Sequence, residues 1–319
     1  MAVFTEVSRD EAAALMQRLG LGQLVAMAGC AGGIENTNYF VSTLRDGTRH
    51  EWVLTLFERL THAQLPFYLY LMQHLAAKGI PVPDPQADGD GAILHTVRGK
   101  PAAVVNRLRG ASVLDPGPQH CAQVGAMLAR MHLAARDYPR QQPNLRGLAW
   151  WNETVPVVLP YLQPEQAELL RDELAYQNAL AGTDAYRRLP AGPVHADLFR
   201  DNVMFEDGRL SGVFDFYFAG CDTWLFDLGV ALNDWCIDLG SGHDDPERVA
   251  ALLQAYEGVR PLQPDETALL PALRRAAALR FWISRLWDWY LPRQASVLKP
   301  HDPTHFERVL RARRQEVAA

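Results

Sequence analysis

The alternation of apolar and polar residues divides the chain into two regions. Up to residue 108, short apolar runs separated by turn residues predict antiparallel strands, which we place at 23–28, 39–42, 52–57, 92–97 and 102–108. Helical spacing of apolar residues predicts helices at 8–19, 65–78, 120–136, 164–181 and 279–290. This pattern predicts an α+β fold with two lobes. The N-terminal lobe combines an antiparallel sheet with helix, and the larger C-terminal lobe is mainly helical.

A change in composition marks the expected boundary between the lobes. The last strand of the first region ends at Leu108, and a polar, Pro-containing stretch runs from Arg109 to Pro118. At 319 residues the chain exceeds the usual size of one domain. We therefore predict an N-terminal lobe at 1–108, a linker at 109–118 and a C-terminal lobe at 119–319.

Composition narrows the possible partners. Apolar residues make up 48% of the chain and charged residues 21%, as in ordinary globular proteins, and the net charge of -6 gives no basic surface for nucleic acid. No stretch has the length of a membrane span or the pattern of a secretory leader. The four cysteines, Cys30, Cys121, Cys221 and Cys236, show no CxxC spacing. We expect a cytoplasmic protein that acts on small molecules.

The clearest chemical signal lies between His195 and Asp215. Asp197 and Asn202 are five positions apart on an expected loop, and a hairpin of strands 203–205 and 210–214 returns the chain to Asp215. Phosphoryl transfer needs a carboxylate to accept the proton of the attacking hydroxyl, with amide and carboxylate oxygens to hold Mg²⁺. We predict Asp197 as the base, and Asn202 and Asp215 as the Mg²⁺ ligands. Alternatively, Asp197 caps a turn and Asp215 ends a hairpin, but the combined pattern disfavours this interpretation.

A glycine-rich stretch between the first two strands is the second candidate. Backbone amides in such a turn can approach phosphate oxygens, although glycine and asparagine also serve positive φ in ordinary hairpin turns. The predicted nucleotide-binding residues here are Gly32, Gly33, Ile34, Asn36 and Thr37. Asn38 is a candidate for phosphate or substrate. The chain has no GxxxxGK[ST] motif, so it is not a P-loop protein.

The spacing of Asp197 and Asn202 resembles the catalytic loop of kinases. Ala196 replaces the arginine of the protein-kinase triplet, and Asp215-Phe-Tyr217 lacks the final glycine of the metal motif. Both departures resemble small-molecule kinases with an aminoglycoside-phosphotransferase-like fold. This resemblance implies a bilobal, protein-kinase-like fold that binds ATP and Mg²⁺.

In a fold of this kind, strand 52–57 would carry a lysine for the phosphates. Thr55 or a neighbour occupies that position, and helix 65–78 has no acidic partner for a lysine. We expect the phosphate lysine to be absent, and Arg59, glycine-loop amides or Mg²⁺ to carry the phosphate charge.

The same resemblance implies roles for two more groups of residues, and a third group is chosen from the chemistry of the residues themselves. The main chain at Val105, Asn106 and Arg107 would face adenine, unless the segment is an ordinary edge strand. His195, Asp222 and Asp227 would support the catalytic loop, with Asp227 placed where a helix N-cap is needed. The tentative substrate-binding residues are Asn38, Trp282, Arg285 and Asp288. An arginine suits a carboxylate and an aspartate suits an ammonium group, whereas a core helix would equally explain the tryptophan.

Four segments carry a narrower resemblance. Segments 33–41 (GIENTNYFV), 53–58 (VLTLFE), 65–67 (LPF) and 280–288 (RFWISRLWD) are similar to the homoserine kinases of the aminoglycoside-phosphotransferase superfamily. The resemblance implies transfer of the ATP γ-phosphate to the side-chain hydroxyl of L-homoserine, a step of threonine biosynthesis.

Two other functions stay open. One is a kinase for another small alcohol, such as choline, ethanolamine, a sugar derivative or an aminoglycoside. The other is a nucleotide-binding pseudokinase that acts as an interaction module. The missing lysine favours the pseudokinase, while the intact Asp197, Asn202 and Asp215 argue against it.

Overall fold

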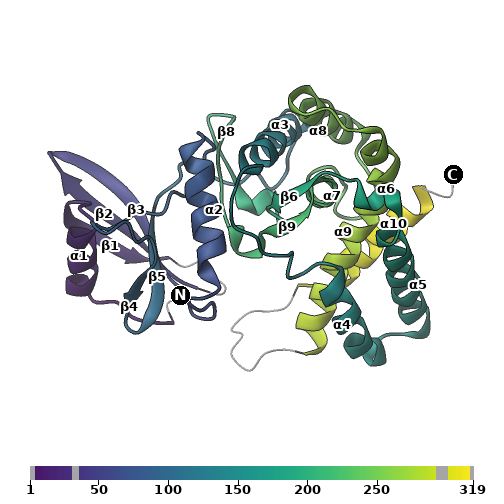
Figure 1. The fold of residues 1–319 in the computed structure, drawn as a ribbon, viewed down its shortest axis with the longest axis horizontal. Helices are drawn as coiled ribbons and strands as arrows, with labels where there is room; N and C mark the ends of the chain where they lie inside the picture. The colour runs from purple at the N-terminus through teal and green to yellow at the C-terminus, as the bar shows by residue number, and fades with distance from the viewer. Residues whose placement is uncertain (1–3, 31–35, 292–300, 317–319) are drawn as a thin grey trace. The chain divides into compact units, whose positions relative to one another are not determined.

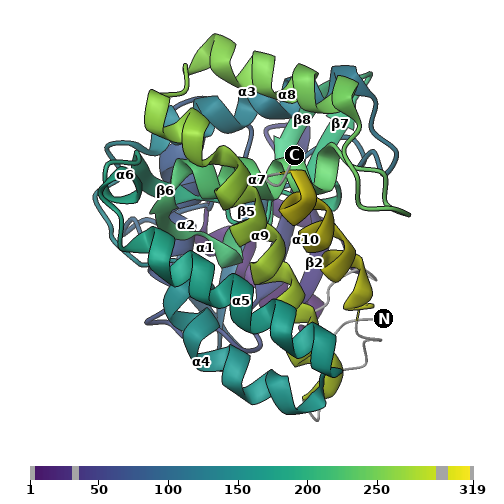
Figure 2. The same cartoon turned by 90° about the vertical axis from the view of Figure 1, so that its right-hand side faces the viewer.

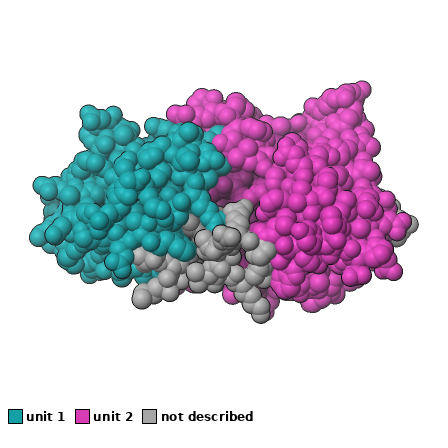
Figure 3. All heavy atoms as spheres, turned by 90° about the horizontal axis from the view of Figure 1, so that it is seen from below, with its two compact units in different colours: residues 1–109, 211–214 teal, residues 110–210, 215–319 magenta. Residues whose placement is uncertain are grey.

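The computed structural model describes residues 4–30, 36–291 and 301–316. The chain forms two compact units (Figure 3). Unit 1 contains residues 1–109 and 211–214, and unit 2 contains residues 110–210 and 215–319. In the described part of the chain, no helix combines the length and apolar character needed to cross a membrane.

Unit 1 is built on the predicted antiparallel sheet. Its five strands have the order β1-β2-β3-β5-β4, and every neighbouring pair is antiparallel. The strands are β1 (Gln23–Gly29), β2 (Thr37–Arg45), β3 (Thr48–Leu56), β4 (His95–Val97) and β5 (Lys100–Asn106). β2 and β3 extend further than expected, because Asp46 and Gly47 adopt positive φ and form a tight hairpin turn that pairs the polar ends of both strands.

Helix α1 (Arg9–Arg18) covers one face of this sheet (Figure 1). Ser8 caps its N-terminus, and Glu11 completes the capping box. Ala12, Leu15 and Met16 are buried against apolar side chains of β2, β3 and β5. Their spacing follows the helical repeat, which is why the sequence pattern identified this helix correctly. The second helix of the unit, α2, spans Leu65–Ala77.

Unit 2 is mainly helical, as predicted. Its helices are α3 (Pro118–Ala135), α4 (Leu148–Val158), α5 (Pro164–Ala181), α6 (Asp184–Arg187), α7 (Trp224–Trp235), α8 (Pro246–Val259), α9 (Pro264–Tyr290) and α10 (Thr304–Glu316), with 3₁₀ turns η1 (Leu159–Tyr161), η2 (Arg200–Asn202) and η3 (Phe216–Phe218). Figure 2 shows α9 running between α5 and α10. All residues of α7 are buried, so this helix forms the centre of the unit.

The chain also forms two short β-ribbons. β6 (Ala191–Val194) pairs antiparallel with β9 (Gly220–Thr223). β7 (Val203–Glu206) and β8 (Arg209–Val213) form the expected hairpin, in which Asp207 and Gly208 adopt positive φ at the turn. The segment between β6 and β7 is the loop that carries the strongest chemical signal of the sequence.

The close approach of α3 and α8 depends on Gly125. A Cβ atom at this position would lie 2.2 Å from the carbonyl oxygen of the buried Leu252 in α8. We expect Gly125→Ala to lower the free energy of unfolding by about 1–3 kcal/mol, because overpacking forces the two helices apart. Urea denaturation would measure this change.

Gly258 in α8 provides the matched control. A Cβ atom there would meet nothing within 4 Å. Gly258→Ala should leave the stability unchanged or raise it by up to about 1 kcal/mol, because alanine loses less backbone entropy in a helix. Equal stability of the two variants would contradict the close packing of α3 on α8.

Candidate active site

The loop between β6 and β7 begins with a strained backbone. Ala196 has a φ of 62°, a left-handed conformation that costs a residue with a Cβ atom about 1–2 kcal/mol. Asp227 holds this conformation, because its Oδ1 accepts a hydrogen bond from the Ala196 N–H and its Oδ2 accepts one from the His195 N–H, both at 2.8 Å. The carboxylate therefore fixes the backbone that immediately precedes Asp197.

Asp227 is a buried residue inside the first turn of α7. The expected N-cap role is wrong, because Thr223 caps this helix with its hydroxyl group. Oδ2 of Asp227 also lies 3.1 Å from Nε2 of His132, whose Nδ1 is 2.8 Å from the Tyr256 hydroxyl. Burial acts to raise the pKa of Asp227, but the hydrogen bond and charge of His132 outweigh it and lower this pKa. The ionised carboxylate thus connects the loop to α3 and α8.

The far end of the loop is held by the last turn of α7. Arg200 donates from its backbone N–H to Oδ2 of Asp234 at 2.8 Å, and its Nε donates to the same oxygen at 3.1 Å. The indole N–H of Trp235 donates to the Leu198 carbonyl at 2.9 Å. Asp227 and Asp234 are seven residues apart and therefore lie on one face of α7. One helix positions both ends of the loop.

Asp197 lies between these two anchors. Its N–H donates to Nδ1 of His195 at 3.2 Å, and the amide of Asn202 donates to its carbonyl at 2.8 Å and to its Oδ2 at 3.2 Å. Burial raises the pKa of Asp197 to about 8, Arg280 opposes this rise, and the negative charge of Asp215 adds to it. The charges of the two predicted carboxylates therefore influence one another.

Asn202 of this loop and Asp215, which follows β8, fit a divalent cation. Because the Asn202 amide nitrogen donates to Asp197, its Oδ1 is left as an acceptor with no hydrogen bond among the described residues. Asp215 has a φ of 66° and lies just before η3. The negative charges of Asp215 and Asp197 repel each other, and a bound cation would reduce this repulsion. The described residues contain no group of three His, Cys, Asp or Glu that could hold a metal. One amide and one carboxylate match Mg²⁺, which takes few protein ligands and completes its shell with phosphate and water.

The predicted glycine-loop residues lie partly outside the described residues. The structure does not describe residues 31–35, which include Gly32, Gly33 and Ile34. Asn36 forms a bend before β2. Thr37 is fully buried, and its hydroxyl donates to Oε1 of Glu58 at 2.7 Å while accepting from the N–H groups of residues 4 and 5. Its side chain is therefore engaged within unit 1 rather than available for a phosphate.

Thr55, a candidate for the position of the expected phosphate lysine, donates from its hydroxyl to Oδ1 of Asn38 across the β2–β3 pair at 2.7 Å. Lys100, at the start of β5, pairs with Glu58. Side chains alternate along a strand, so Lys100 shares a face with Ala102 and Val104, which pack in the α1 core. Lys100 thus lies on the sheet face opposite Thr55 and does not replace the missing lysine there.

The three residues predicted to face adenine lie at the end of β5. Val105 pairs with Val53 of β3, and Oδ1 of Asn106 accepts a hydrogen bond from the Asp84 N–H at 2.7 Å. The Arg107 N–H donates to the Glu51 carbonyl at 3.0 Å. The guanidinium carbon of Arg107 lies 4.0 Å from the ring centre of Phe40 in β2. The Arg107 amide is thus already used in the sheet.

The tentative substrate residues of α9 differ in exposure. Trp282 is fully buried and contributes to the core of unit 2. Asp288 is exposed, and the guanidinium of the partly buried Arg285 lies 4.5 Å from the ring of Phe306. Asp222, predicted to support the catalytic loop, instead accepts a hydrogen bond from Asn144 at 2.8 Å, because β9 places it beside that residue.

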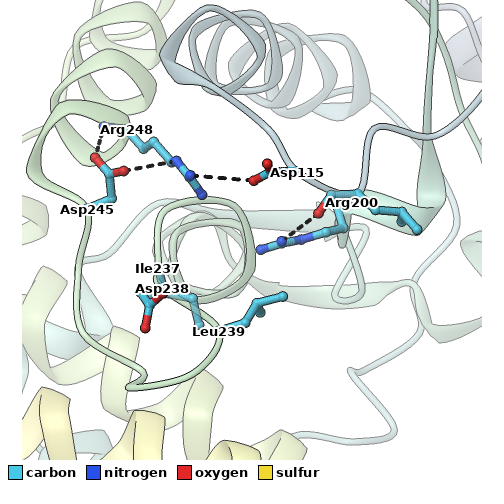
Figure 4. Close-up of a pocket in the computed structure, with 8 residues that line it drawn as sticks. Asp115, Arg200, Ile237, Asp238, Leu239, Asp245 and Arg248 are labelled. Atoms are coloured by element: carbon cyan, nitrogen blue, oxygen red, sulfur yellow. Dashed lines mark hydrogen bonds and ion pairs between the residues drawn. The ribbon is translucent and has the colours of Figure 1, made fainter.

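A pocket of about 350 Å³ lies beside the anchor at Arg200 (Figure 4). Its walls include the ion pair between Arg248 and Asp245, and Asp115 faces Arg248 across it. The lining residues do not include Asp197, Asn202 or Asp215. The pocket therefore lies against the supporting side of the loop and not at its carboxylates.

The sequence interpretation missed three residues of this site. His132 was not among the candidate site residues, yet it lies at hydrogen-bond distance from Asp227. Asp234 and Arg280 were not singled out. The seven-residue spacing of Asp227 and Asp234 was the signal that could have identified the second anchor. Arg280 carries no such local signal.

Comparison with known proteins places this site in a family context. The model of the phosphotransferase enzyme family (APH) matches residues 27–270. The chain is 68% identical over 313 residues to the homoserine kinase of Polaromonas naphthalenivorans (strain CJ2), covering 98% of both chains. It is 58% identical to the homoserine kinase of Cupriavidus necator, covering 98% of this chain and 96% of that relative. Among solved structures, an amicoumacin kinase in complex with AMP-PNP, Ca²⁺ and Ami has a TM-score of 0.65 at 16% identity, covering 91% of this chain and 87% of that one. This last likeness shows a shared fold.

Proposed function

Because the chain belongs to the phosphotransferase enzyme family, we propose that it is an ATP-dependent kinase that phosphorylates the side-chain hydroxyl of L-homoserine. The observation that carries the proposal is the 68% identity to a homoserine kinase over 98% of both chains. The arrangement of Asp197, Asn202 and Asp215 in unit 2 supports the same chemistry. The product would be O-phospho-L-homoserine, an intermediate of threonine biosynthesis.

In this reaction Asp197 acts on the acceptor hydroxyl. Its carboxylate accepts a hydrogen bond from the hydroxyl and takes its proton as the oxygen bonds to the γ-phosphorus of ATP. The bond between that phosphorus and the bridging oxygen of ADP breaks, and ADP leaves. The Asn202 amide keeps the carboxylate oriented, since it bonds both the backbone carbonyl and Oδ2 of Asp197.

Residues for Mg²⁺ and for the nucleotide come from different segments of the chain. Oδ1 of Asn202 and the carboxylate of Asp215 would hold Mg²⁺, which neutralises phosphate charge when bound. For the nucleotide, we propose the backbone of the glycine-rich stretch at residues 32–37 and the main chain at residues 105–107, apart from the Arg107 N–H, which donates to Glu51. The antiparallel β1–β2 pair on either side of that stretch supports this proposal.

We also propose that the protein works in the cytoplasm. Cys30, Cys121, Cys221 and Cys236 are all free thiols in the structure. Unpaired cysteines are typical of a reducing compartment.

A panel of acceptor alcohols tests the proposed function. The measurement is ADP release by the purified protein with Mg-ATP and L-homoserine, L-serine, choline, ethanolamine or an aminoglycoside. We expect L-homoserine to support turnover on the order of 1–100 s⁻¹ and the other alcohols to be poor substrates. If another alcohol is preferred, the protein is a kinase of different specificity. If no alcohol is phosphorylated, the interaction-module function replaces the enzymatic one.

A further inference from the structure

Arg280 of α9 is a buried arginine with an unused pair of donors. Arg280 is only 3% exposed to solvent. Neither its Nε nor its Nη2 has a hydrogen-bond partner among the described residues. Two other buried arginines of α9 contact carboxylates. Arg274 donates to Asp244, and Arg275 donates to Glu173 through Nε at 3.1 Å and Nη2 at 2.6 Å. Buried polar groups are nearly always paired, so the lone donors of Arg280 need an explanation.

The two donors are arranged for an anion with two oxygens. The N–H bonds of Nε and Nη2 lie on the same edge of a guanidinium and point in parallel, which matches the oxygens of a carboxylate. Aromatic rings hold the plane of this group, since the guanidinium carbon lies 3.9 Å from the ring centre of Phe281 and 5.0 Å from that of Phe218. The rings therefore contact the guanidinium group, whose Nε and Nη2 edge makes no hydrogen bond among the described residues.

Arg280 also lies within electrostatic reach of the proposed base. Burial raises the pKa of Asp197, and the charge of Arg280 is the first effect that opposes this rise. In turn, burial lowers the pKa of Arg280, and Asp197 opposes that change. Yet no ion pair or hydrogen bond joins the two side chains in the described part of the chain. The charges of the two groups thus act on one another although no hydrogen bond joins them.

We propose that the Nε and Nη2 edge of Arg280 binds the α-carboxylate of the substrate and so selects an amino-acid alcohol over alcohols without a carboxylate. This inference rests on the proposed function and adds a specificity-determining residue to it. A short chain of carbon atoms joins the carboxylate of homoserine to its hydroxyl. A carboxylate bound at Arg280 therefore places the hydroxyl in the neighbourhood of Asp197.

The assignment differs from the one based on sequence, which chose Arg285 from the same helix. Arg285 already donates from Nη1 to the Asp302 carbonyl at 3.5 Å and stacks on Phe306. Its charge opposes that of Arg280, whereas the charges of Asp197 and Asp288 favour the charged form of Arg280. Of the two arginines, Arg280 is the one that is deeply buried and whose Nε and Nη2 both have no hydrogen-bond partner among the described residues.

Two substrates and one variant test the inference. We compare kcat/KM for L-homoserine with kcat/KM for 3-amino-1-propanol, which is homoserine without its carboxylate. The wild type should strongly prefer homoserine. In Arg280→Lys, which keeps the charge and loses the planar edge, this preference should fall by about 10- to 100-fold, the value of one charge-assisted hydrogen bond. The KM for ATP should stay unchanged.

Arg275→Lys is the matched control, because it makes the same change at a buried arginine of α9 whose partner is Glu173. It should lower stability but preserve the ratio of the two substrates. The inference is overturned if Arg280→Lys reduces both substrates equally, if it raises the KM for ATP instead, or if the wild type accepts both substrates equally well. This last comparison needs no variant, so it stands even where Arg280→Lys fails to fold. A wild type that phosphorylates neither compound would instead contradict the proposed function.

Discussion

Replacing Asp197 with asparagine should lower kcat for L-homoserine by about 10²- to 10⁴-fold, the usual contribution of a general base. Asparagine has nearly the same shape but cannot take the hydroxyl proton. Its amide would also compete with the amide of Asn202, which donates to Oδ2 of Asp197. Because the loop anchors at Asp227 and Asp234 are untouched, the variant should remain folded. Steady-state kinetics with Mg-ATP and L-homoserine would measure the loss.

Asp207→Asn is the control for this substitution. Asp207 lies exposed in the β7–β8 turn with a φ of 50°, a conformation that asparagine also tolerates. Its kinetics should match those of the wild type. If Asp197→Asn also kept the wild-type kcat, Asp197 would not be the base and the assignment of the site would fail.

Asp227→Asn should have the largest effect on stability. The Asp227 carboxylate is fully buried and accepts hydrogen bonds from the N–H groups of His195 and Ala196, with His132 as a third partner. An asparagine offers only one oxygen, so its amide nitrogen must face a backbone donor. Breaking such a buried charged network costs about 3–5 kcal/mol, a large part of the 5–15 kcal/mol that stabilises a typical domain. Urea denaturation would report this loss.

The same variant should lose activity while it is still folded. When one of the two hydrogen bonds to the backbone is lost, the strained φ of Ala196 can relax and displace Asp197. The control is Asp172→Asn, since Asp172 is an exposed residue of α5 that makes one long ion pair with Arg314 at 3.9 Å. Such surface changes are worth about 0.5 kcal/mol or less. Equal denaturation midpoints for the two variants would show that Asp227 does not hold the loop.

The part of the site that is local in sequence could be predicted from the sequence. Asp197, Asn202 and Asp215 lie within a loop and a hairpin whose turn residues, Asp207 and Gly208, are recognisable. The helices with clear apolar spacing, such as α1 and α5, were also found nearly to their bounds. In these segments the local pattern and the tertiary structure agree.

Other features depend on contacts between distant segments. Asp227 was placed at a helix N-cap from a local rule, whereas the structure uses it inside α7 to bind the loop more than thirty residues earlier. Lys100 could be assigned to a sheet face only after the pairing of β3 with β5 was known. The role of Arg280 became visible only through its burial and its missing partners.

The most direct test of the proposed function is the identity of the product. Purified protein would be incubated with Mg-ATP and L-homoserine, and the mixture analysed by mass spectrometry. The proposal predicts O-phospho-L-homoserine in an amount equal to the ADP released. Release of ADP without phosphorylated homoserine would contradict it, and so would the absence of any reaction.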